Sequence, residues 1–439
     1  MNRRTFLSRG AVLVTMGTSA GDCVPLDDAA LNPCENGACP GEDATAALQL
    51  CHDICVRNGG GRIVIDRPLL CTSVTERGGL WTTLEFWGDD ITLQFQGEGS
   101  LEFPRGDLQN YRPMIVGGMA KLGSQARKIT TQRCVDAVVH PIEGPLQAGA
   151  SVVPLADTRH YRAGDIVYLR TGQLLSKLQT EPDAELAKVR AVRDSALELE
   201  GPLAKPYQQE FDLSDGRTSP RAHGSPAPYG IVNVSDRVTR NFTMINPVIR
   251  ASGALQLLSI WSVWGFRSDG GTLTFGNNGV GSRDSRFVHW NTPLVHTGRV
   301  PGSYALAPST GCSDWDVVWD VRSPTFTFLH IHEGVARSRF RGRLRLGGEG
   351  GKGPGLSIAA RAYDIDIQKL DIDTGNSDQA AIIVRDDVMG GVHFHDLSVR
   401  NRSTIGSAIR IDTPQGVTFS KPPVFPGANR VLKTAIRKV

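Results

Sequence analysis

Hydrophobic and polar residues alternate along the second half of the chain, and the alternating pattern recurs at a nearly constant interval. Segments that begin at Leu329, Leu356, Ile382 and Ile409 align with offsets of 27, 26 and 27 residues. Each copy holds an alternating strand, a glycine-containing turn and a second alternating strand, so it can bury its inward side chains only by stacking on its neighbours. We therefore expect a right-handed parallel β-helix, since an antiparallel sandwich would show hairpin dipeptides at shorter, less regular spacing.

The N-terminal half predicts a cap and an insertion. A short amphipathic helix should begin at Asp43, its candidate N-cap, and stop at Asn58, where three glycines follow. Strands are expected at 62–65 and 91–95, and short strands divided by turn residues over about 144–207 predict a small inserted β subdomain. The predicted layout is a signal peptide (1–20), a Cys/Pro-rich lead (21–42) and a β-helix domain (43–439) that carries the insertion.

The first residues resemble an export signal. Arg3 and Arg4 precede an apolar stretch over 11–16 and small residues that end at Ala20, which is the pattern of a twin-arginine signal peptide. The mature protein is therefore expected in the periplasm or outside the cell, and no later stretch is apolar enough to span a bilayer. In an oxidising compartment the cysteines are expected to form disulfides that staple the cap, where six of the eight lie. These six are Cys23, Cys34, Cys39, Cys51, Cys55 and Cys71.

Composition agrees with an elongated protein and limits its partners. The 439 residues include 49 glycines and 7% aromatic residues, a balance that fits a repeat architecture better than several compact domains. The formal net charge of +3 provides no global steering toward nucleic acid or an anionic membrane. Any preference for a charged ligand must therefore be local.

Stacked coils place equivalent residues of successive copies about 4.8 Å apart, so the alignment is also a map of the surface. In the copy at Leu329, His330 and His332 should point outward, with Glu333 at the turn. At the same positions the following copies present Ser357, Ala359 and Ala360, then Ile383, Arg385 and Asp386, then Arg410 and Asp412. A low coil of small residues flanked by charged coils is the expected shape of a sugar subsite.

Two interpretations of this surface remain open. In the functional interpretation, His332 or Arg385 abstracts a proton, and Glu333 or Asp386 serves as an acid, a metal ligand or a substrate-orienting group. Further substrate contacts would come from His330, Arg361 and Arg410. In the structural interpretation, His332 and Glu333 cap a turn and Arg385 pairs with Asp412 on the neighbouring coil.

Two further groups of residues are candidates for ligand contact. Arg283, His289 and Trp290 combine cationic and aromatic groups and form a secondary candidate sugar platform. A run of arginines at every second position predicts a neutralised charge ladder rather than a polyanion site, because aspartates fill the neighbouring copies. The arginines are Arg337, Arg339, Arg341, Arg343 and Arg345, and the aspartates include Asp314, Asp316, Asp320, Asp366 and Asp371.

The helix from Asp43, the glycine turn at 59–61 and the strand after it resemble the N-terminal entry of the pectate lyase superfamily. With the repeat, they make the chain similar to pectin-lyase-like parallel β-helix proteins, which include uronate lyases, polygalacturonases, epimerases and viral tailspikes. The resemblance implies an exported enzyme that cleaves a polysaccharide. Ser268-Asp269-Gly270 matches only part of the polygalacturonase motif, and the sequence lacks the other motifs of that group.

Lyases of this fold abstract the proton next to a uronate carboxyl with Arg, Lys or His. Histidine and arginine are abundant on the repeat and lysine is sparse, which favours β-elimination from a uronate polymer. Hydrolysis by paired carboxylates and non-catalytic carbohydrate binding, as in an adhesin, are the alternatives. Asp386 and Asp387 could bind Ca²⁺, the one cofactor that the resemblance suggests.

Overall fold

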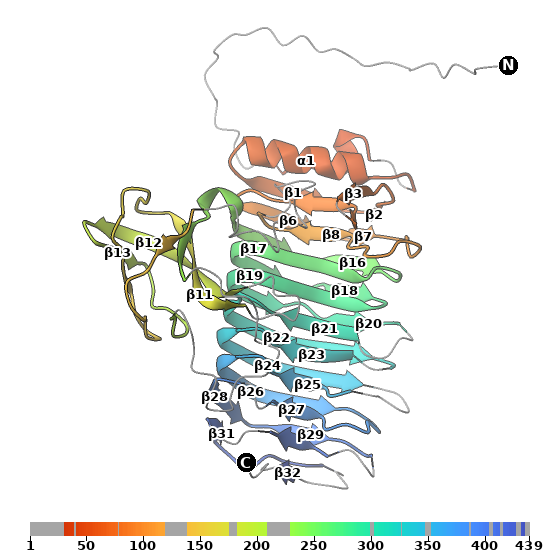
Figure 1. Ribbon diagram of the computed structural model, residues 1–439. Coiled ribbons are helices and arrows are strands. Elements are labelled where there is room, and N and C mark those ends of the chain that lie inside the picture. The colour runs from red at the N-terminus through yellow and green to blue at the C-terminus, as the bar shows by residue number, and fades with distance from the viewer. Residues whose placement is uncertain are drawn as a thin grey trace, which may run out of the picture.

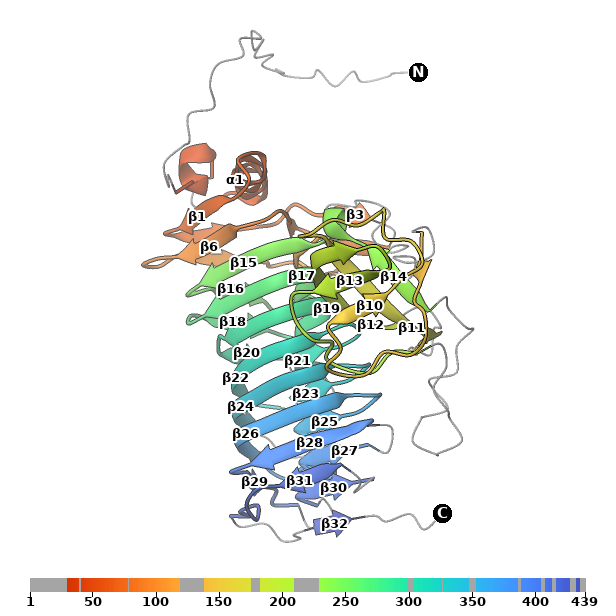
Figure 2. The same ribbon diagram turned by 90° about the vertical axis from the view of Figure 1, so that its left-hand side faces the viewer.

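The computed structural model is an elongated parallel β-solenoid with an antiparallel β subdomain on one side (Figures 1 and 2). The structure describes residues 30–38, 41–77, 79–118, 138–174, 182–208, 229–298, 303–325, 327–346, 353–385, 388–403, 407–412, 416–426 and 432–434. The solenoid predicted from the repeat is confirmed. The predicted signal peptide lies outside the described residues, and no helix within them is long and apolar enough to cross a membrane.

Parallel strand pairs stack on three faces, which we call A, B and C. Face A contains β1 (Gly61–Ile65), β6 (Ile91–Phe95), β15 (Thr239–Ile245), β28 (Gly390–His395) and β31 (Val417–Phe419). Face B contains β2 (Pro68–Leu70), β7 (Ser100–Glu102), β16 (Val248–Ala251), β18 (Thr272–Phe275), β20 (Leu294–His296) and β29 (Ser398–Arg400). Face C contains β5 (Leu84–Phe86), β8 (Met114–Val116), β21 (Ser303–Pro308), β23 (Thr327–Ile331), β25 (Leu356–Ile358), β27 (Ile382–Val384), β30 (Ile409–Ile411) and β32 (Leu432–Thr434).

Five long strands connect these faces. Two of them, β17 (Gln256–Asp269) and β19 (Asn278–Asn291), begin on face C and end on face A. Three others, β22 (Ser313–Ser323), β24 (Ala336–Leu346) and β26 (Tyr363–Asp373), begin on face A and end on face B. A short antiparallel pair, β3 (Thr75–Arg77) and β4 (Leu80–Thr82), lies beside the first coils.

The register of face C is the one that the repeat predicted. Leu329 pairs with Leu356, Leu356 with Ile382, and Ile382 with Ile409, and all four of these side chains are fully buried. Alternation therefore fixed which side of each strand faces inward. Trp290 is one of the inward residues: it is completely buried and stacks on Phe266 with ring centroids 6.3 Å apart. The expectation that Trp290 binds a sugar is wrong, because its ring fills the core.

A helical cap closes the N-terminal end of the solenoid. It consists of the 3-10 helix η1 (Pro33–Asn36) and the helix α1 (Thr45–Arg57), which stops before Asn58 as predicted (Figure 1). The N-cap is Ala44 rather than Asp43, but the Asp43 carboxylate still accepts a hydrogen bond from the Thr45 amide at 3.1 Å. Further amides of Thr72 and Ser73 donate to Asp43, which ties the helix start to the chain after β2.

The cap is held by apolar packing rather than by the expected disulfides among its described cysteines. Cys51, Cys55 and Cys71 are buried as free thiols, and so is Cys312 in the solenoid. Burial raises the pKa of the Cys51 and Cys55 thiols to about 11, so both are protonated and pack as small apolar groups. The prediction of stapling is therefore wrong for these residues, and Cys23, Cys39 and Cys134 lie outside the described residues.

The inserted subdomain is a six-stranded antiparallel sheet with the order β10-β13-β12-β11-β14-β9. Its strands are β9 (His140–Pro141), β10 (Val152–Pro154), β11 (Ile166–Leu174), β12 (Pro182–Arg193), β13 (Ala196–Leu199) and β14 (Gly230–Asn233). The predicted limits of 144–207 were too narrow, because β9 and β14 belong to the same sheet. Successive residues of β14 are buried on both sides, which removes the alternating signal that marks a half-exposed strand.

Candidate functional site

His330 and His332 point outward from β23 on face C, as predicted. Their imidazole rings stack with centroids 3.9 Å apart, while Leu329 before them and Ile331 between them are fully buried. Glu333 follows at the turn toward face A in the left-handed conformation, with φ 56°. Its carboxylate lies 3.6 Å from Nδ1 of His332 and accepts a hydrogen bond from the Thr310 hydroxyl at 3.1 Å.

The coils beyond β23 present the small and then charged residues that the alignment predicted. His330 is in register with Ser357, Ser357 with Ile383, and Ile383 with Arg410. Ser357 and Ile383 are buried, and Arg385, two residues after Ile383, is exposed. The expected pair between Arg385 and Asp412 is wrong, since Asp412 pairs with Arg410 of its own strand at 2.7 Å. The predicted register from His330 to Arg410 is therefore present, and the sugar subsite stays a prediction.

Opposing charge effects set the protonation of this cluster. Burial alone would raise the pKa of Glu333, but His332, the Arg283 guanidinium and the Thr310 hydroxyl together lower it to about 2. Burial lowers the pKa of His330 to about 2, and the neighbouring charges of His332 and Arg385 add to that effect. At neutral pH Glu333 is therefore an anion and His330 a neutral imidazole. An ionised Glu333 can orient His332 or a substrate, but it has no proton to donate.

The coils before β23 add residues that the sequence interpretation missed. The Tyr304 hydroxyl donates a hydrogen bond to Oε1 of Gln256 at 2.6 Å, and the Gln256 amide in turn donates to Ser259 at 2.7 Å. Ser259 is in register with Gly281, where a Cβ would come within 2.7 Å of the Gln256 amide nitrogen. Glycine is thus required for Gln256 to lie flat on this face. The signal in the sequence was the series of small outward residues Ser259, Gly281 and Ala307.

The inserted subdomain supports the turn that carries Glu333. Lys205 is completely enclosed and donates a hydrogen bond from Nζ to the carbonyl of Gly334 at 2.7 Å. Asp183 pairs with Lys205 and, at 3.1 Å, with Arg361 of the next turn of the solenoid. Arg361 is only 1% exposed. Its expected contact with a substrate is therefore wrong, and its role is to anchor the subdomain.

The remaining candidates lie on other faces or outside the described residues. His289 lies on face A between Asp269 and Asp316, each 3.3 Å away, and does not approach His332. Asp386 and Asp387 are not among the described residues, so the calcium hypothesis stays a prediction. Within the described part of the chain, no group of three or more histidine, cysteine or carboxylate side chains is placed to hold a metal ion.

The arginine run after Gly334 is a paired ladder, as predicted from the aspartates of the neighbouring coils. Its five ion pairs are Arg337–Asp314, Arg339–Asp366, Arg341–Asp316, Arg343–Asp320 and Arg345–Asp371. The pairs cross between coils on faces A and B and are separate from the histidine cluster of face C.

Acid should destabilise the folded protein partly through His330. The unfolded chain binds a proton at this histidine below its ordinary pKa of 6.5, whereas the folded chain does not bind it until about pH 2. The contribution of neutral His330 to the free energy of unfolding is therefore fully present above pH 6.5 and is lost as the pH falls. In urea unfolding at pH 7.5 and 5.5, both above the ordinary pKa of 4.5 for Glu333, His330→Gln should lose less stability between the two pH values than the wild type. A His393→Gln control should lose as much as the wild type, and equal losses in all three proteins would contradict this prediction.

Comparisons with known proteins return structures but no sequence family. No family model matches the chain, and neither does any curated protein sequence. The tailspike protein gp49 from Pseudomonas phage LKA1 shares 14% identity over 91% of this chain and 76% of its own, with a TM-score of 0.43. The gp54 tailspike of Acinetobacter baumannii bacteriophage AP22, solved in complex with A. baumannii capsular saccharide, shares 9% identity over 92% of this chain and 75% of its own, with a TM-score of 0.42.

The A-module of the Azotobacter vinelandii mannuronan C-5 epimerase AlgE6 shares 12% identity over 92% of this chain and 99% of its own, with a TM-score of 0.25. At such identities and TM-scores these similarities assign no activity to the chain. Any functional conclusion must therefore come from the cluster on face C.

Proposed function

We propose that the protein is an exported polysaccharide lyase of the pectin-lyase-like kind, which cleaves a uronate-containing polymer by β-elimination on face C. The observation that carries the proposal is the cluster of His330, His332 and ionised Glu333 between two cations. The charge of Arg283 lowers the pKa of Glu333 from one side, and that of Arg385 lowers the pKa of His330 from the other. An extended saccharide would cross the coils along this line.

Each of these groups would have one role in the reaction. Arg283 and Arg385 would neutralise the uronate carboxylate, which makes the adjacent C–H bond more acidic. His332 would remove that proton, and Glu333 would orient the imidazole and stabilise the imidazolium that forms. The electron pair of the C–H bond becomes the new C=C bond, the C–O bond to the leaving sugar breaks, and water protonates the leaving oxygen.

Elimination fits the cluster better than hydrolysis does. A glycoside hydrolase needs two carboxyl groups, one of which must be protonated to act as an acid. Among the described residues, the centre of the cluster contains one carboxylate, Glu333, and its lowered pKa keeps it ionised. Asp284, two coils before Glu333, accepts a hydrogen bond from Tyr168 of the inserted subdomain at 2.5 Å and is buried.

A panel of acidic polysaccharides tests the proposal. The protein should be incubated with polygalacturonate, polymannuronate, polyguluronate and a neutral glucan, with and without added Ca²⁺. Ultraviolet absorbance from unsaturated uronates in one acidic polymer alone would support β-elimination, and its dependence on Ca²⁺ would test the assignment of Asp386 and Asp387. New reducing ends without that absorbance would overturn the lyase in favour of a hydrolase. Binding with neither signal would overturn it in favour of an adhesin.

A further inference from the structure

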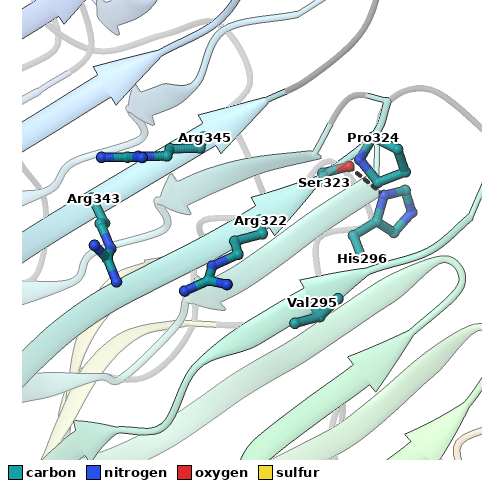
Figure 3. A pocket seen from close by; sticks show the side chains of 7 residues that line it. All are labelled: Val295, His296, Arg322, Ser323, Pro324, Arg343 and Arg345. Atoms are coloured by element: carbon teal, nitrogen blue, oxygen red, sulfur yellow. Dashed lines mark hydrogen bonds between the residues drawn. The ribbon is translucent and has the colours of Figure 1, made fainter.

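Face B carries a cavity of about 440 Å³ that plays no part in the cluster on face C. It is lined by Arg322, Arg343 and Arg345 at one end, and Figure 3 shows these three side chains lying side by side over the strands. The other end is formed by Val295, His296, Ser323 and Pro324. His296 is completely buried and is fixed by a hydrogen bond between its Nδ1 and the Ser323 hydroxyl at 2.8 Å. The cavity therefore has a rigid end and a cationic end.

The cationic end places like charges against each other. Arg322 and Arg345 occupy directly opposite positions in the parallel pairing of β22 and β24. Like charges in such positions destabilise a sheet unless a counter-charge lies between them. Asp320 pairs with Arg343 at 2.8 Å and with Arg322 at 3.5 Å, whereas Arg345 lies 3.9 Å from Asp371, its nearest carboxylate within the described part of the chain.

The aspartate opposite Arg345 on the neighbouring coil pairs with other arginines. Asp373 is in register with Arg345, but its carboxylate pairs with Arg400 and Arg402, both at 3.2 Å. Among the described residues, the three arginines that line the cavity thus share two aspartates, Asp320 and Asp371, which leaves positive charge beside an open volume. An anion that lies between Arg322 and Arg345 would relieve their repulsion and accept charge-assisted hydrogen bonds from both.

We propose that this cavity is a second saccharide site that binds a carboxylate or sulfate group of an acidic polysaccharide through Arg322 and Arg345. The described residues that line the cavity include no tyrosine, tryptophan or phenylalanine, so they offer no ring on which a nucleobase could stack. Acidic sugars present anionic groups without that requirement. The site does not depend on the proposed lyase activity, since it lies on another face and requires binding alone.

Affinity electrophoresis of the full chain tests this site. The protein should carry His332→Ala so that the gel polymer is not cleaved, and the gels should contain polygalacturonate, dextran sulfate, neutral dextran or single-stranded DNA. Arg322→Gln/Arg345→Gln should weaken binding to the acidic polysaccharide about fivefold or more. The matched double variant Arg190→Gln/Arg193→Gln removes two exposed arginines of the inserted subdomain and should bind normally. Circular dichroism should confirm that each variant is folded.

The different gels show which anionic group the cavity binds. Arginine-dependent retardation by polygalacturonate alone supports a carboxylate ligand, and the same effect with dextran sulfate alone supports a sulfate ligand. Equal retardation of the parent and the Arg322→Gln/Arg345→Gln protein in both polysaccharides would overturn the site. Arginine-dependent retardation confined to single-stranded DNA would overturn its assignment to a saccharide.

Discussion

His332→Ala should reduce kcat for cleavage of the uronate polymer by about 10²–10⁴-fold, the typical contribution of a positioned general base. His330 cannot replace the missing imidazole, because its pKa near 2 makes it a poor proton acceptor at neutral pH. The KM should change far less than kcat, since the neighbouring arginines would still hold the uronate carboxylate. Steady-state rates of absorbance increase on the polymer identified by the panel provide the measurement.

His395→Ala is the matched control for that substitution. His395 lies on face A, where it pairs with Asp366 at 3.1 Å, and is partly exposed like His332. Its removal should leave kcat and KM unchanged. A His332→Ala enzyme with wild-type kcat would eliminate this cluster as the catalytic centre, whatever its effect on KM.

The sequence predicted the coil register because burial constrains it at every second residue. A shift of one residue in β23 would expose Leu329 and Ile331 and bury His330, so only one register satisfies both sides of the strand. The outward direction of His330 and its position beside Ser357 followed from that register. The candidate site was therefore predictable to the extent that it lies on one regular face.

Contacts between the solenoid and the inserted subdomain were not predictable in the same way. Arg361 was expected to contact a substrate, yet the Asp183 that pairs with it comes from a distant segment of the chain. Local patterns contain no information about such a partner. Trp290 is a different case. Val288 and Trp290 are two residues apart and both face inward from β19, so the alternating pattern could have placed the ring in the core.

Asp183→Asn should destabilise the attachment of the inserted subdomain by about 3–5 kcal/mol, the usual cost of breaking a buried ion pair. The substitution keeps the shape of the side chain but removes the enclosed negative charge that pairs with Lys205 and Arg361. Hydrogen exchange should therefore accelerate in the amides of β11 and β12, while those of β24 and β26 keep their protection. Glu198→Gln is the control, since Glu198 binds two exposed arginines of the same subdomain, Arg190 and Arg193, and its loss should leave exchange unchanged.

The same substitution should also lower catalytic activity, although Asp183 lies behind the cluster on face C. Lys205, which Asp183 holds in place, donates to the carbonyl of Gly334, and Gly334 directly follows Glu333. Once Lys205 is released, the turn loses its support and Glu333 no longer keeps a fixed position beside His332. We expect kcat to fall with little change in KM, and addition of Lys205→Met should restore part of the stability but not of kcat. Unchanged exchange in β11 and β12 would show that the buried charges do not hold the subdomain in place.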